Sequence, residues 1–131
     1  MNNHYLKTKN FLQELKVNIV KEDENDGIFV IEKESFGIKN LIVGVASPIV
    51  ILEQFIFKIN QSNETIFKEL LKKNRDIVHG AFVLDDSGER VIFRDTLQLE
   101  NLDLNELEAS LNSLSLLLSE YSDQIIAFSK Y

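Results

Sequence analysis

The chain has 131 residues, of which 44% are apolar. This is enough for one ordinary domain whose core removes roughly two thirds of the unfolded surface from water. Fourteen lysines and arginines against twenty-one aspartates and glutamates give a net charge of -7, which repels phosphate backbones and anionic lipids. We therefore expect neither a nucleic acid nor a membrane as partner.

The composition also bears on compartment and on redox chemistry. No apolar run approaches the roughly 20 residues that a membrane-spanning helix needs. The opening stretch MNNHYLKTKNFLQELKV alternates charged with apolar residues, unlike the apolar core of a signal peptide. We therefore expect a cytoplasmic protein. The sequence has no cysteine, which excludes disulfides, thiol nucleophiles and cysteine metal sites.

The first half of the chain predicts a helix followed by four strands. Apolar residues at helical spacing predict an amphipathic helix over residues 3–17. Residues 18–24 and 28–33 are typical of a hairpin, because Asp26 and Gly27 supply turn chemistry between two alternating segments.

Residues 38–59 form a second extended region. Pro48 has no N–H for a ladder hydrogen bond, so it marks a turn or an edge bulge between two strands. After Pro48, the alternation places five apolar side chains on one face, namely Ile49, Ile51, Phe55, Phe57 and Ile59.

A short helix and a second hairpin follow. Ser62 or Asn63 can cap the helix, whose apolar stripe faces away from its charged residues. The hairpin places Gly80, Phe82 and Leu84 on one face, turns through residues 85–88 and returns through residues 91–93. The stripe of the short helix consists of Ile66, Phe67, Leu70 and Leu71.

Local signals agree on where the last helix begins. Asp103 is a good N-cap, and Glu106 stands at the third helical position, where its side chain can reach back. Leu102, just before the cap, can form a hydrophobic staple with Leu107.

The last helix carries a heptad-like apolar seam. Leu116, Leu117 and Ile126 widen the seam, which favours a helix packed on a sheet over a pure coiled coil. About 26 residues at ~1.5 Å each span roughly 39 Å, about twice a strand of ~17 to 20 Å. Either the helix breaks within residues 119–123, or its end projects and needs cover, most simply from a second subunit. The seam consists of Leu104, Leu107, Leu111, Leu114, Leu118, Tyr121, Ile125 and Phe128.

Patterns that carry catalytic or metal chemistry are weak throughout. EDENDG at residues 22–27 resembles a calcium loop, but aligning Gly27 with the turn glycine leaves Lys33 where the bidentate glutamate should stand. Asp85, Asp86 and Glu89 are better explained as a polar hairpin tip than as ligands. His4 and His79 lack zinc-ligand spacing, and the chain has neither GxSxG nor a Gly-rich phosphate loop. We predict no catalytic, cofactor-binding or metal-binding residues and no enzyme activity.

The segment NRDIVHGAFVLDDSGERVIFRDTLQLENLDLNELEASL, residues 74–111, resembles the YbjN family. The order of elements is more loosely similar to the CesT-like type III secretion chaperones, which are small acidic dimeric proteins. The strand ILEQFIFKI after Pro48 does not match residue by residue, so effector-binding pockets cannot be carried over. The likeness rests on Asn74, on Gly80, Phe82, Leu84 and Asp85 of the first strand, on the turn Gly88, on Val91 and Arg94, and on the leucine-rich final helix.

The resemblance implies an α+β fold over residues 1–131. In this fold, a single antiparallel β-sheet is packed with N-terminal, middle and long C-terminal helices, as in type III secretion chaperones, and the protein is often a dimer. Chaperone-like relatives hold a client segment in extended form by covering its apolar side chains, without a cofactor. We therefore expect a single-domain, non-enzymatic protein-binding module, chaperone-like or regulatory, that covers an apolar segment of a partner polypeptide as a homodimer.

Eight apolar residues are the candidates for protein binding or dimerisation. The strand after Pro48 and the hairpin carry more apolar side chains than one helix layer obviously covers, and an acidic surround would keep such a patch soluble. The alternative that these side chains are simply core is favoured, because apolar residues are mostly buried. The candidates are Phe55, Phe57, Ile66, Phe67, Leu70, Leu114, Leu118 and Tyr121.

Two other functions stay open. An immunity- or inhibitor-type protein would bind one basic partner through its acidic surface, and added salt would weaken that binding steeply. A small hydrolase or metal-dependent enzyme would use Asp85, Asp86 and Glu89, and replacing all three would abolish activity while leaving the fold intact.

Overall fold

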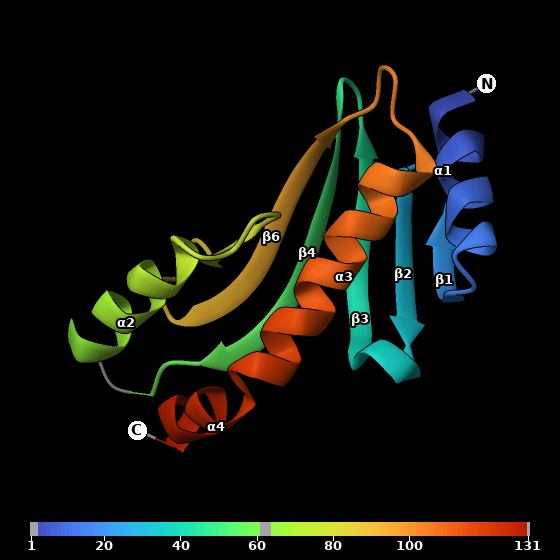
Figure 1. The fold of residues 1–131 in the computed structure, drawn as a ribbon. Helices are drawn as coiled ribbons and strands as arrows, with labels where there is room; N and C mark the ends of the chain where they lie inside the picture. The colour runs from blue at the N-terminus through green and yellow to red at the C-terminus, as the bar shows by residue number, and fades with distance from the viewer. Residues whose placement is uncertain (1–2, 61–63, 131) are drawn as a thin grey trace.

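The computed structural model describes residues 3–60 and 64–130, which form one six-stranded sheet with four α-helices (Figure 1). The strand order is β1-β2-β3-β4-β6-β5, and every neighbouring pair is antiparallel. This is the α+β fold that the sequence predicts. The elements are α1 (Asn3–Glu14), β1 (Asn18–Asp23), β2 (Ile28–Lys33), a 3-10 turn η1 (Glu34–Phe36), β3 (Ile38–Ala46), β4 (Ile49–Lys58), α2 (Glu64–Asn74), β5 (Ala81–Leu84), β6 (Arg90–Gln98), α3 (Leu104–Glu120) and α4 (Ser122–Lys130).

Helix α1 ends three residues earlier than the apolar pattern predicts. Lys16 adopts a φ of 60°, and this left-handed backbone does not continue an α-helix. The N–H of Val17 still donates to the carbonyl of Leu12 at 3.3 Å, which closes the helix end. The apolar spacing continues through Leu15 and Val17 because both are buried below the end of the helix.

The predicted turns lie where the sequence puts them. Gly27, with a φ of 70°, ends the turn between β1 and β2. The chain reverses between β3 and β4 at Ser47 and Pro48, whose peptide bond is cis. The proposed caps of α2, Ser62 and Asn63, lie outside the described residues.

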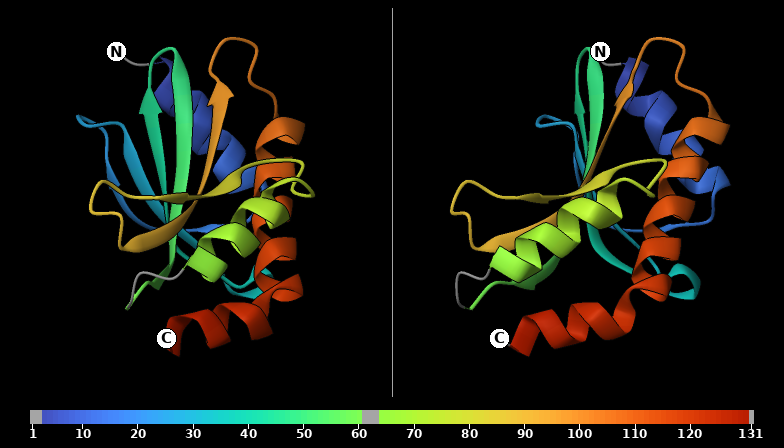
Figure 2. Two further views of the ribbon diagram at one scale, coloured as in Figure 1. Left: turned by 90° about the vertical axis from the view of Figure 1, so that its left-hand side faces the viewer. Right: turned by 60° about the vertical axis from the view of Figure 1, so that its left-hand side comes forward.

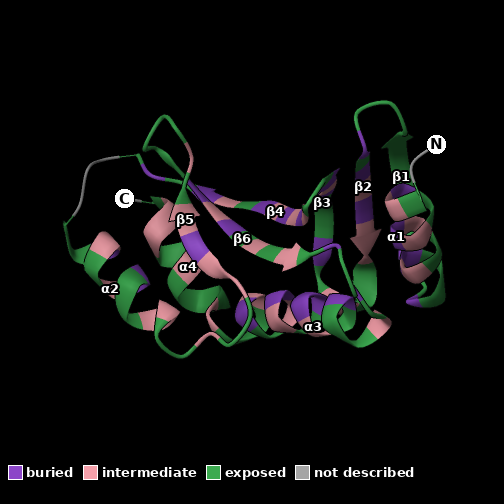
Figure 3. Ribbon diagram, turned by 90° about the horizontal axis from the view of Figure 1, so that it is seen from above, coloured by how far each residue is buried: buried purple, intermediate pink, exposed green. Residues whose placement is uncertain are grey.

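Helices α1 and α3 lie on the same face of the sheet, and the core is the layer between them and the strands (Figures 1 and 3). The ring of Tyr5 on α1 stacks on Phe29 of β2 with centroids 4.5 Å apart. The largest fully buried side chains are Tyr5, Phe29, Phe93, Leu12, Ile31, Ile38, Leu41, Leu52, Leu99, Leu107, Leu111 and Leu114.

A bulge in β4 overturns the prediction that Phe55, Phe57 and Ile59 share one face. The register between β4 and β6 shifts between Phe55 and Phe57. One extra residue in a strand reverses the face to which the following side chains point. Phe55 is therefore exposed on the outer face, whereas Phe57 and Ile59 are buried in the core.

The predicted capping box at the start of α3 is present. The N–H of Glu106 donates to Asp103 Oδ1 at 2.7 Å, and the N–H of Asp103 donates to Glu106 Oε1 at 3.4 Å. The long C-terminal helix then breaks at Tyr121, inside the predicted interval, and continues as α4. Phe128 of α4 packs toward Phe57 with ring centroids 6.0 Å apart, so the end of the chain returns to the sheet instead of projecting from it.

The seam of α3 and α4 is part of the core, as favoured over a coiled coil. Its members are buried or packed against buried residues. The three residues predicted to widen the seam differ in burial, because Leu117 is buried while Leu116 and Ile126 are exposed. The apolar stripe is thus narrower than the sequence pattern indicates.

Candidate protein-binding surface

The face of the sheet opposite α1 and α3 is not covered by any of the described helices (Figure 2). Apolar side chains remain exposed on it, one from each of three strands, namely Ile28 of β2, Ile42 of β3 and Phe55 of β4. Exposed apolar side chains gathered on one face are typical of surfaces that bind another protein. We call this the open face.

A row of apolar residues crosses three strands of the open face. Phe55 of β4 is paired with Ile92 of β6, and Ile92 is paired with Val83 of β5. Directly paired residues of antiparallel strands place their side chains on the same face. These three residues form the Phe55 row, in which Phe55 is 45% exposed.

Charged side chains border the Phe55 row. The guanidinium of Arg90 lies over the ring of Phe55, 4.1 Å from its centroid, and its Nε is 3.7 Å from Asp85 Oδ2. Arg94 pairs with Glu53 at 3.3 Å on the same face. The row therefore has a polar rim, as protein interfaces do.

The Phe55 row ends at a groove between α2 and β5. Val83, the last member of the row, is one of the lining residues. The groove has a volume of about 260 Å³, and Leu71, 70% exposed, stands at its side. Apart from Asn74, the lining is apolar and consists of Phe67, Leu70, Leu71, Phe82, Val83, Leu84 and Val91.

Asn74, the last residue of α2, fixes the position of β5. Its Nδ2 donates to the carbonyl of Phe82 at 3.1 Å, and its Oδ1 accepts from the N–H of Phe82 at 2.8 Å. This amide replaces a neighbouring strand at the edge of the sheet, because it satisfies the outward-facing donor and acceptor of Phe82. Helix α2 is thereby held at the edge of the sheet, where the groove forms.

The sequence profile of the CesT_Tir_1 family matches residues 1–131. This match spans the whole chain. The chain belongs to the CesT_Tir_1 family. A comparison with curated proteins finds no match.

Solved structures share the fold of this CesT_Tir_1 protein. YbjN from E. coli is similar with a TM-score of 0.71 and 12% identity, covering 92% of each chain. The HopA1-SchA chaperone-effector complex contains a chain with a TM-score of 0.62 and 12% identity, covering 98% of this chain and 96% of that one. The Yersinia pestis type III secretion chaperone SycH, in complex with a fragment of YscM2, gives 0.57 and 14%, covering 97% and 100%. The fold is thus shared with YbjN and with chains of two chaperone complexes.

The eight candidate residues of this CesT_Tir_1 chain divide between core and surface. Phe57, Ile66, Leu70 and Leu114 are buried in the subunit. Phe67, Leu118 and Tyr121 are partly buried, and Phe55 is exposed. Phe67 and Leu70 line the α2–β5 groove, whereas Tyr121 lies near α3 and the connection before β5. Their roles in binding or dimerisation stay predictions.

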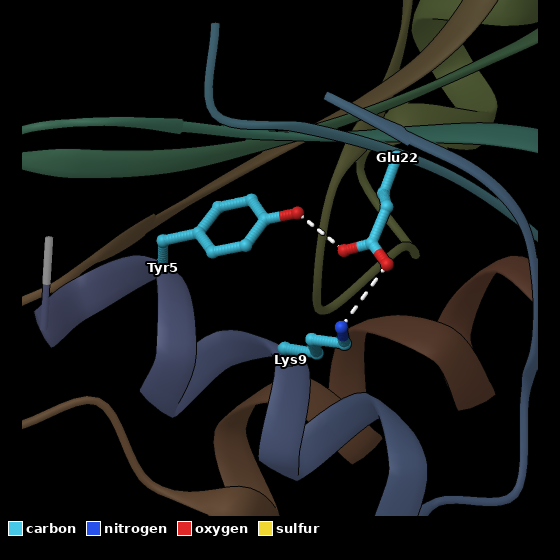
Figure 4. A network of polar contacts seen from close by, with 3 residues as sticks. All are labelled: Tyr5, Lys9 and Glu22. Atoms are coloured by element: carbon cyan, nitrogen blue, oxygen red, sulfur yellow. Dashed lines mark hydrogen bonds and ion pairs between the residues drawn. The ribbon is translucent and has the colours of Figure 1, made fainter. Parts of the chain in front are cut away.

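A polar contact outside the groove joins α1 to β1 (Figure 4). The hydroxyl of Tyr5 donates to Glu22 Oε2, and Lys9 Nζ lies 3.0 Å from Glu22 Oε1. The Tyr5 hydrogen bond and then the Lys9 ammonium lower the pKa of Glu22. Burial, followed by the Glu22 carboxylate, raises the pKa of Tyr5. The contact fastens the edge strand β1 to the helix that covers β2.

The hairpin tip between β5 and β6 is organised by its own hydrogen bonds. Ser87 Oγ donates to Asp85 Oδ1 at 2.6 Å, and this bond is the main cause of the lowered pKa of Asp85. Ser87 Oγ also accepts from the N–H of Glu89 at 3.1 Å. Within residues 3–60 and 64–130, we find no group of three or more His, Asp or Glu side chains that could hold a metal ion. In the same residues, we find no helix that is both long and apolar enough to cross a membrane.

Sequence reasoning missed several exposed apolar residues near these surfaces. Leu116 on α3 belongs to the predicted apolar stripe of the last helix, so the pattern placed it in the core. Leu84 at the groove was predicted only to share one face of the hairpin with Phe82. Val78 lies in the connection between α2 and β5, for which no element was predicted. Its only signal in the sequence is a valine in a segment otherwise rich in polar residues.

Proposed function

We propose that the protein is a non-enzymatic cytoplasmic protein-binding module, chaperone-like or regulatory, that covers an apolar segment of a partner polypeptide and works as a homodimer. The observation that carries this proposal is the apolar path from Phe55 through Ile92 and Val83 to the α2–β5 groove. An extended segment can bury alternate side chains along such a path, because its side chains point to one face at every second residue.

Similar structures support a protein as the partner. HopA1-SchA is a chaperone-effector complex, and the chaperone SycH is solved in complex with a fragment of YscM2. In the described part of this chain, the contacts of Asp85 and Glu89 are those of a hairpin turn, which supports binding over catalysis. The Phe55 row and the β5 side of the groove are the surfaces on which we place the partner segment.

The proposed homodimer uses the exposed side of α2. Leu71 projects from this side, and burying one leucine stabilises an interface by about 1.5–3 kcal/mol. The helix begins with Glu64 and carries Lys72 in its last turn, and both residues are exposed. Two copies of α2 packed antiparallel about a two-fold axis would place each acidic start beside a basic end and oppose their macrodipoles. A parallel arrangement would bring like charges together.

The oligomeric state tests the dimer. Leu71→Asp should give a monomer with an unchanged far-ultraviolet circular dichroism spectrum, because it places two desolvated carboxylates in the proposed interface. Leu6→Asp is the matched control, since Leu6 is an exposed leucine on another helix, and it should leave the dimer mass unchanged. Light scattering after size exclusion gives the mass. A wild-type protein that is monomeric at every concentration contradicts the homodimer but not the binding of a client.

Capture of a partner tests the binding surface. The wild type and two variants would be used as baits in native lysate, and the captured polypeptide would be identified by mass spectrometry, purified and titrated calorimetrically. Phe55→Ser should weaken its binding about tenfold or more, because each 1.4 kcal/mol of lost apolar burial is a factor of ten. Ile42→Ser, on the same open face but outside the Phe55 row, is the control. Equal affinity of wild type and Phe55→Ser refutes this surface.

The alternative of an immunity- or inhibitor-type protein rests on the net charge of -7. Such a protein would bind one basic partner through its acidic surface, so Phe55→Ser would leave affinity unchanged. Affinity would also fall steeply between about 50 mM and about 500 mM salt, because the Debye length shortens severalfold. The affinity of a chaperone-like module should therefore depend on Phe55, whereas the affinity of an immunity- or inhibitor-type protein should depend on the salt concentration.

A further inference from the structure

A second groove lies between α3 and the connection that joins α2 to β5. It has a volume of about 310 Å³ and shares no lining residue with the α2–β5 groove. Val78 and His79 of the connection form one wall, and Leu116 of α3 forms the other. Asp76, Glu120 and Tyr121 also line it. We call it the Val78–Leu116 groove.

The two apolar walls are exposed to an unusual degree. Val78 is 85% exposed and Leu116 is 63% exposed. The connection that presents Val78 is fixed on both sides of it. The N–H of Ile77 donates to the carbonyl of Asn74 at 3.3 Å, and Ser113 Oγ donates to the carbonyl of His79 at 2.6 Å. Val78 is therefore held outward by an anchored backbone, so little ordering entropy remains to be lost on binding.

The charge at one side of the groove is negative. Burial, followed by the carboxylates of Glu120 and Asp76, raises the pKa of Tyr121, which places both carboxylates within electrostatic reach of one phenol. Neither carboxylate forms an ion pair with a described residue. Lys73, whose ammonium lies 5.1 Å from the Tyr121 ring centroid, pairs with Glu69 at 3.9 Å. Among the described lining residues there is no lysine or arginine.

We propose that the Val78–Leu116 groove binds a polypeptide segment in which an apolar side chain is flanked by lysine or arginine. The apolar side chain would cover Val78 and Leu116, and the basic neighbours would reach Asp76 and Glu120. A segment flanked by aspartate or glutamate would be repelled, so charge selects the partner in this groove. This inference rests on the proposed function and adds a contact point with its own specificity.

Two designed peptides test the groove on the full chain. The first has one central leucine flanked by lysines in a serine and glycine background, and the second has glutamates in place of the lysines. In two-dimensional amide NMR spectra, the lysine peptide should shift signals of residues 76–79 and 112–121. The affinity of the glutamate peptide should be lower than that of the lysine peptide by a factor of about ten or more, and a factor of ten corresponds to 1.4 kcal/mol.

Variants divide the apolar from the charged contribution. Val78→Ser with Leu116→Ser should weaken the lysine peptide about tenfold, and so should Asp76→Asn with Glu120→Gln, each about 1.4 kcal/mol. Only the charged contribution should decline with added salt. Leu6→Ser, at an exposed leucine of α1 that lines neither groove, is the matched control and should leave peptide affinity unchanged. Near-neutral effects on folding are expected because Val78 and Leu116 are exposed.

Several results would overturn this inference. It fails if the two peptides bind equally, if the shifts fall on the Phe55 row, or if the groove variants change the mass of the oligomer, which would make the groove a contact between copies. If Phe55→Ser abolishes client binding while the groove variants change neither peptide nor client affinity, only the groove inference fails. If neither Phe55→Ser nor the groove variants change client affinity, the proposed function fails as well.

Discussion

The side-chain amide of Asn74 pairs with the backbone of Phe82 as a neighbouring strand would. One bond runs from Asn74 Nδ2 to the carbonyl of Phe82 and the other from the N–H of Phe82 to Asn74 Oδ1. A single side chain at the end of α2 thus both closes part of the β5 edge and sets the width of the α2–β5 groove. The same asparagine belongs to the segment that resembles the YbjN family, and the paired bonds give it a physical role.

Asn74→Ala should therefore destabilise the fold by about 1–3 kcal/mol, because it leaves a donor and an acceptor of partly buried backbone without partners. Urea unfolding followed by circular dichroism measures the change. Asn10→Ala, at an exposed position of α1, should stay within about 0.5 kcal/mol of the wild type. A cost for Asn74→Ala as small as that of the control would show that the paired bonds do not hold β5.

Substitutions at two glycines distinguish the effect of backbone strain from the effect of a steric clash. Gly27 and Gly88 have φ values of 70° and 73°, so Gly→Ala costs about 1–2 kcal/mol of left-handed strain at either. A Cβ on Gly27 would also lie 2.6 Å from the carbonyl oxygen of Val45, whereas a Cβ on Gly88 meets nothing within 4 Å. Gly27→Ala should therefore be clearly more destabilising than Gly88→Ala in urea unfolding. If the two variants lost equal free energy of unfolding, the backbone at this end of the β2–β3 pair would have to shift to admit the methyl group.

A pair of leucines on α3 tests the separation of core from surface. Leu114 is fully buried, so Leu114→Ala should cost about 2–5 kcal/mol, the sum of lost burial and the cavity that remains. Leu116→Ala, two residues along the same helix, should cost less than about 0.5 kcal/mol because Leu116 is exposed. Thermal and urea unfolding of both variants measure the difference. Similar costs would indicate that Leu116 is covered in solution, for example by a second copy.

Acid unfolding reports on the contact between α1 and β1. The Tyr5 hydroxyl and the Lys9 ammonium lower the pKa of Glu22 in the folded protein. A carboxyl whose folded pKa lies below its unfolded value of about 4.3 adds stability that is present above that pH. This stability is lost as the pH falls through the folded pKa. Glu22→Gln should therefore be less stable than the wild type at pH 7, and the two should converge at acidic pH.

Urea titrations at pH 7 and near pH 3 measure this convergence. Glu108→Gln, at an exposed position of α3 outside this contact, is the control for the loss of one acidic side chain. A difference between wild type and Glu22→Gln that does not shrink on acidification would show that the ionised carboxylate of Glu22 does not stabilise the fold.

The sequence by itself determined the features that depend on neighbouring residues. The Asp103–Glu106 capping box, the turns at Gly27 and Pro48 and the order of helices and strands all follow from local hydrogen bonding and backbone preference. Such interactions are completed within a few residues, so their signals stand in the sequence unaltered. The likeness of residues 74–111 to the YbjN family drew on these same signals.

Only the tertiary structure decided which apolar residues remain exposed. Phe55 and Phe57 lie two residues apart and look alike in the pattern, but the bulge against β6 turns one outward and the other inward. Leu116 and Leu117 differ in the same way because only one of them faces the sheet. Burial is set by which distant element covers a side chain, and hydrophobicity alone records only that burial is favourable. Exposed apolar side chains on the sheet were therefore predictable in kind from the sequence, whereas packing decided which residues they are.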